Sequence, residues 1–158
     1  MSLASDFRRL RALPWRDRLL LAETVVALAT ASVAVGLIPF RRIMSSLRAA
    51  PPADREPAAA LDIIDRVRWA IEACGRRLPW RIVCFQKGLA FHRILRRRGI
   101  GTVLHYGVAR GDDSSLKAHV WISYQGRSML GGEVAGDYVC LAAFPAADAF
   151  PAPSNLSR

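Results

Sequence analysis

Two residues of this sequence have the types and local contexts that nucleophilic catalysis requires. Cys84 follows the segment 79–83 and begins a helical pattern, where free backbone N–H groups and the positive end of the helix dipole favour a thiolate. His119 lies in an alternating segment that places it with Trp121 on one face of a strand. We interpret Cys84 as a nucleophile and His119 as the general base that takes its proton. The alternative is that both are packing residues.

A third group is needed to orient the imidazole of His119. Glu133 is the first carboxylate after His119, and Asp137 is the second. The Gln125-Gly126 turn sends the chain back beside the histidine strand, so either acid could approach the ring. We predict Glu133 as the third member of the triad. The competing accounts are that Asp137, Asp112 or a backbone carbonyl holds the ring.

The cysteine and histidine content argues against a disulfide framework and against a metal site. The cysteines are odd in number and have no CxxC spacing, and the few histidines do not cluster with them. We therefore predict no metal and no cofactor, and we expect a reducing, cytoplasmic environment. The residues concerned are Cys74, Cys84, Cys140, His92, His105 and His119.

The N-terminal third contains the most apolar stretch of the chain. Residues 19–40 are apolar apart from Glu23 and are followed by two arginines, and 29–31 resembles a signal-peptidase site. The run is rich in alanine, serine and threonine, and it contains both a glycine and a proline. We therefore predict a buried or partner-facing helix from about 14 to 36 in preference to a membrane span or a signal peptide.

The remaining pattern predicts an α+β fold in which N-terminal helices precede a catalytic helix packed on a small antiparallel sheet. The strands are expected to form a meander. We divide the chain into a helical segment at 1–60, a core at 61–145 and a disordered tail at 146–158. The expected elements are helices at 41–47, 61–75 and 84–98, a linker at 49–54, and strands at 102–108, 116–124, 127–130 and 138–141.

Length and charge bound the possible partners. The 158 residues suit one compact domain, and 52% of them are apolar, which argues against disorder. The formal charge is +10, and all but two of the 23 basic residues are arginine. Such a surface favours an anionic partner. Nucleic acid is not expected, because no recognition helix and no basic strand interleaved with aromatic residues is present.

Several motifs, taken in order, resemble the transglutaminase-like leader peptidases of lasso-peptide biosynthesis. They are Cys-Phe-Gln-Lys-Gly-Leu-Ala at 84–90, Leu-His-Tyr-Gly-Val at 104–108, Lys-Ala-His-Val-Trp at 117–121 and Gly-Gly-Glu at 131–133. The resemblance covers about 61–145, and the segment 14–21 is similar to the N-terminal helix of those proteins. It implies a papain-like Cys-His-Asp protease, the stand-alone half of a split maturation enzyme. Such an enzyme removes the leader from a ribosomally made precursor.

Carried over to this sequence, the resemblance makes Cys84 the nucleophile and His119 the base. The sequence departs from the family at the acid, because Gly131-Gly132 stands where relatives usually carry aspartate and Glu133 is the nearest substitute. Val120 also replaces the small residue common between the histidine and the tryptophan. The implied partners are the precursor peptide, a separate leader-recognition protein and the ring-closing cyclase, and a membrane is not expected.

Two other functions remain open from the sequence alone. An acyltransferase of the same fold would use an amine in place of water as the second nucleophile. A non-catalytic, membrane-associated adaptor would use 24–40 as its anchor and would leave Cys84 and His119 as packing residues.

Overall fold

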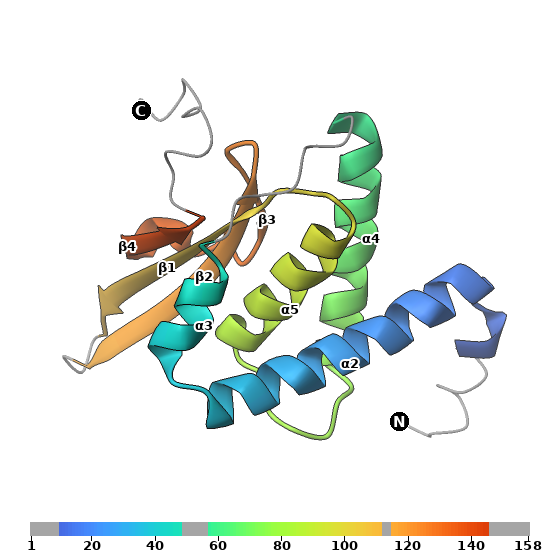
Figure 1. Ribbon diagram of the computed structural model, residues 1–158, viewed down its shortest axis with the longest axis horizontal. Helices are drawn as coiled ribbons and strands as arrows, with labels where there is room; N and C mark the ends of the chain where they lie inside the picture. The colour runs from blue at the N-terminus through green and yellow to red at the C-terminus, as the bar shows by residue number, and fades with distance from the viewer. Residues whose placement is uncertain (1–9, 49–56, 112–114, 146–158) are drawn as a thin grey trace.

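The computed structural model describes residues 10–48, 57–111 and 115–145, and it contains helices followed by one sheet (Figure 1). The predicted α+β class is confirmed, and the predicted strands at 116–124 and 127–130 have the observed bounds. The predicted linker at 49–54 and tail at 146–158 lie outside the described residues. The elements are helices α2 (Trp15–Leu37), α3 (Phe40–Ser46), α4 (Pro57–Gly75) and α5 (Cys84–Arg97), strands β1 (Val103–Arg110), β2 (Leu116–Tyr124), β3 (Arg127–Leu130) and β4 (Val139–Phe144), and a short 3₁₀ helix, η1 (Ala135–Asp137).

The sheet is antiparallel throughout, with the strand order β3-β2-β1-β4. The predicted meander is therefore correct for β1, β2 and β3 but wrong for β4, which pairs with β1 and not with β3. Gly131 has a φ of +70°, a conformation that glycine adopts without strain, and it turns the chain away from β3. The segment 132–138 then crosses to the free edge of β1.

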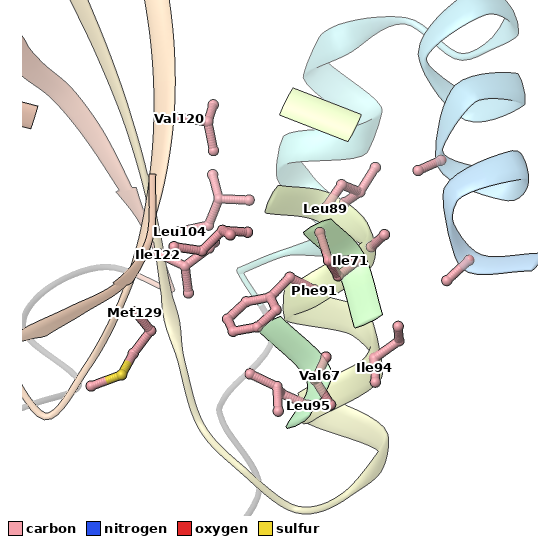
Figure 2. Close-up of a cluster of buried hydrophobic side chains, with 14 of the residues drawn as sticks. Val67, Ile71, Leu89, Phe91, Ile94, Leu95, Leu104, Val120, Ile122 and Met129 are labelled. Carbon is pink, nitrogen blue, oxygen red and sulfur yellow. The ribbon is translucent and has the colours of Figure 1, made fainter. Parts of the chain in front are cut away.

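Helix α5 lies at the centre of the core, where it packs on the sheet and on the helices α2 and α4 (Figure 2). Its apolar side chains Leu89, Phe91 and Ile94 are fully buried. The alternation predicted for β2 is confirmed, because Val120 and Ile122 are buried toward the helices. The opposite face of β2 carries His119, Trp121 and Ser123.

Helix α2 belongs to the same hydrophobic core, with Leu28 and Ala31 fully buried. The helix is long and apolar enough to cross a membrane by length and composition, with a mean hydropathy of 1.9. Its Glu23 forms an ion pair with Arg98, at the C-terminal end of α5. Hydrogen bonds from Arg98 hold the pKa of Glu23 below its ordinary value, in spite of partial burial. The acid that interrupts the apolar run is thus a link between two core helices.

His92 is a buried histidine of α5 that takes no part in the candidate site. Its Nδ1 lies 2.9 Å from the hydroxyl of Thr102. Burial lowers the pKa of His92 to about 4, and the nearby charges of Arg96 and Arg93 act in the same direction. The ring is therefore neutral in the folded protein at neutral pH.

This histidine should make the protein less stable as the pH falls. The unfolded chain protonates His92 near its ordinary pKa of 6.5, whereas the folded chain does so only near 4, so stability present above pH 6.5 is lost between these values. We expect His92 to contribute a loss of about 3 kcal/mol in the free energy of unfolding between pH 7 and pH 4. Urea unfolding of the wild type and of His92→Gln at both values measures it. An equal loss in the two proteins would contradict the assignment.

Candidate active site

Cys84 is the first residue of helix α5, as the sequence predicts. Val83 before it has extended backbone torsions, and the N–H of Val83 donates to Oε1 of Gln86 at 2.8 Å, which fixes the start of the helix. The thiol is half-buried. Because Cys84 begins the helix, its thiol lies beside the first-turn N–H groups. These groups have no acceptors within the helix and can hold a developing negative charge.

A close helix–strand contact directs the Cys84 side of α5 toward β2. Cys84 and Gly88 are four residues apart and share one face of the helix. A Cβ atom on Gly88 would lie 2.7 Å from Cγ1 of Val120, so this face packs directly on β2. Cys84 lies about one helical turn before Gly88, and His119 is the residue that precedes Val120. The two predicted catalytic residues therefore flank the same contact.

His119 lies on the opposite face of β2 from Val120, and its ring is held from several sides. Its Nε2 lies 2.7 Å from the carbonyl oxygen of Gly131. Its ring centroid is 5.1 Å from that of Tyr138 and 6.3 Å from that of Trp121. A carbonyl oxygen can only accept, so Nε2 carries the proton, and in the neutral ring Nδ1 is the acceptor. This is the tautomer that a base needs in order to take a proton at Nδ1.

The orienting group in this structure is a backbone carbonyl, one of the alternatives open from the sequence. Gly131 approaches closely: a Cβ there would lie 2.9 Å from the carbonyl oxygen of Val120 and 3.3 Å from Nε2 of His119. Glu133 and Asp137 are exposed, and neither is hydrogen-bonded to His119 within the described part of the chain. The structure does not test the triad role that the sequence predicts for Glu133. Asp112 lies outside the described residues.

Beyond its pairing with β3, strand β2 is flanked by Gly131, whose carbonyl accepts from the His119 ring. Strand β3 pairs only with the segment from Ile122 to Tyr124, and the preceding residues of β2 extend beyond the end of β3. Cys84 faces β2 from the helix side, whereas the His119 ring lies on the other face. Within the described part of the chain, no hydrogen bond joins Cys84 to His119. The structure therefore does not join the two side chains, and the catalytic pairing of Cys84 with His119 stays a prediction.

Sequence reasoning missed a second thiol–imidazole pair on the open face of the sheet. The thiol of Cys140 on β4 lies 4.0 Å from Nδ1 of His105 on β1. The Nε2 of His105 is 2.7 Å from the hydroxyl of Ser123, and its ring stacks on Trp121 with centroids 5.3 Å apart. Burial lowers the pKa of His105, which favours the neutral ring. The alternation of β1 places His105 on this face, but the pairing of β4 with β1 has no local signal.

The chain belongs to the transglutaminase-like superfamily, whose model matches residues 25–141. Folds of this kind typically carry cysteine peptidase or acyltransferase activity. No curated protein and no solved structure gives a significant match. The matched region begins within α2, so the family domain includes most of the helix that completes the core around α5.

The role of Glu133 can be decided by removing charge without changing size. The Gly131 carbonyl already holds Nε2 of His119. We therefore expect Glu133→Gln to catalyse the Cys84-dependent reaction with a single-turnover rate within about threefold of the wild-type rate. A carboxylate that stabilised the imidazolium would give a drop of about 100-fold or more when neutralised. Asp137→Asn is the matched control, because it neutralises the other nearby acid. A large drop confined to Glu133→Gln would establish Glu133 as the third member of the triad.

Proposed function

We propose that this protein is a cysteine protease that removes the leader peptide from a ribosomally synthesised lasso-peptide precursor. The observation that carries the proposal is the hydrogen bond from Nε2 of His119 to the Gly131 carbonyl, which supports His119 as a base. This bond leaves Nδ1 of His119 as the proton acceptor. The Cys84 thiol, from which Nδ1 would take the proton, lies at the N-terminus of α5. The proposed substrate rests on the motifs between 84 and 133, which resemble those of the lasso-peptide leader peptidases.

In the proposed mechanism, Nδ1 of His119 takes the proton from the Cys84 thiol as Sγ attacks the scissile carbonyl carbon. The backbone N–H of Cys84 donates to the oxyanion of the tetrahedral intermediate. The C–N bond breaks, and the imidazolium returns its proton to the leaving amine. Water, deprotonated by the same imidazole, then hydrolyses the thioester and releases the leader with a free carboxylate. Each cycle consumes one water and restores the thiol.

The proposed setting follows from the same resemblance. The protease works in the cytoplasm with a separate protein that recognises the leader, and it hands the shortened precursor to a ring-closing cyclase. The surplus of arginine suits an acidic leader or partner.

Mass spectrometry of the precursor tests the proposal. The precursor encoded beside this protein is incubated with it, with and without the neighbouring recognition protein. We expect two fragments whose masses add up to the precursor plus one water. A product joined to an amine would instead show the acyltransferase. An intact precursor in the presence of both proteins, with the fold verified, would contradict the proposal.

A further inference from the structure

Helix α2 carries an apolar stripe on the side that faces away from the core. The stripe consists of residues three or four positions apart, which places them on one face of the helix. Its five large members are between 58% and 79% exposed. The apolar stripe is made of Trp15, Leu19, Ala22, Val26, Thr30, Val33 and Leu37.

The opposite face of the same helix is already used by the core. Leu20, Leu28 and Ala34 are among its buried residues, and α2 packs there on α4 and α5 (Figure 1). The helix is thus apolar on both faces, although only one is covered in the described structure. A helix that is apolar all round is normally covered on all sides. Within the part of the chain that the structure describes, the apolar stripe is left without a packing partner.

The charges around the stripe indicate which kind of partner it fits. Between residues 10 and 48 the only acids are Asp17 and Glu23. Both are paired with arginines outside α2, Asp17 with Arg66 and Glu23 with Arg98. The charged side chains that remain around the two ends of the stripe are exposed and all basic. They are Arg11, Arg16, Arg18, Arg41 and Arg42.

We propose that the apolar stripe of α2 lies flat on an anionic lipid surface. A helix of this length is about 34 Å long, and its large residues can enter the boundary between headgroups and acyl chains while the arginines contact lipid phosphates. Trp15 lies at one end of the stripe with the Arg16 guanidinium 5.6 Å from its ring, a pair suited to the headgroup level. This contact is peripheral, because the other face of α2 stays in the core. It does not depend on the proposed protease activity.

Co-sedimentation with vesicles tests the lipid contact. We expect the wild type to bind vesicles that mix phosphatidylglycerol with phosphatidylcholine, to bind pure phosphatidylcholine much less, and to dissociate as salt is added. Val26→Asp/Val33→Asp should weaken binding by about tenfold or more, because two charges would enter the apolar boundary. The matched control is Leu116→Asp, at a residue of β2 that is 79% exposed and far along the chain from the stripe.

A second variant keeps the test decisive if the first fails to fold. Arg16→Gln/Arg18→Gln leaves the apolar stripe intact and should weaken binding to the anionic vesicles only. Equal binding of the wild type to both kinds of vesicle, or undiminished binding by the folded variants, would overturn the proposal. The lipid proposal would also be overturned if the wild type did not bind vesicles but bound the recognition protein through the stripe. Precursor cleavage in lipid-free solution reports on the protease separately.

Discussion

Cys84→Ala is expected to abolish precursor cleavage, with a loss of at least about 10⁴-fold in single-turnover rate, while the protein stays folded. The thiol sulfur is the attacking atom of the proposed reaction, so nothing in the variant can form the acyl-enzyme. The fold should survive because Cys84 is half-buried at the first position of its helix and alanine is well tolerated there. Circular dichroism and quenched-flow cleavage, read by mass spectrometry, measure both quantities.

The other two cysteines provide the controls for this result. Cys140→Ala removes the exposed thiol near His105, and we expect its cleavage rate to stay within a few-fold of the wild type. Cys74→Ala removes a buried thiol whose pKa is raised by burial, and it should affect stability more than rate. Full turnover by folded Cys84→Ala would rule out the assigned nucleophile. Loss of activity in Cys140→Ala instead would move the active site to the pair on the open face.

His119→Ala should reduce cleavage by about 10³-fold or more, because the thiol then loses the group that takes its proton. Residues that act as one unit lose function together, so Cys84→Ala/His119→Ala should be little worse than either single variant. The side chain also contacts Tyr138, so the free energy of unfolding must be measured beside the rate.

His105→Ala is the matched control for the base. Its ring lies on the same face of the sheet and stacks on the same tryptophan, but its Nε2 bonds Ser123. We expect a moderate effect on stability and a much smaller effect on rate than for His119→Ala. If His105→Ala were as inactive as His119→Ala while remaining folded, the assigned base would be wrong.

The sequence predicted the elements around the candidate site because their signals are local. The change from a 3.6-residue to a two-residue period placed Cys84 at a helix start and His119 in a strand, and both placements are confirmed. The order of strands is not local: β4 is short, and nothing in Val139–Phe144 distinguishes pairing with β1 from pairing with β3. The contact between Cys140 and His105 could therefore not be predicted from the sequence.

The group that orients His119 was hidden for a different reason. Every residue has a backbone carbonyl, so a carbonyl that accepts from Nε2 leaves no side-chain signature. Only the left-handed Gly131 and its crowded surroundings hint at it, and they become informative once the returning chain is placed. Glu133 was predicted because it is the first acid after the histidine in the sequence.

The contact between Gly88 and Val120 has a consequence for how related sequences should vary. There is no room for a Cβ atom at position 88 while Cγ1 of Val120 lies opposite it. A small residue at position 120, as in the leader peptidases that this sequence resembles, would free that volume. The two positions should therefore covary, with glycine at 88 accompanying a branched residue at 120 and a larger residue at 88 accompanying alanine. A larger residue at 88 alone would displace the cysteine helix, whereas a smaller residue at 120 alone would leave a cavity. Changing both positions together would conserve the spacing.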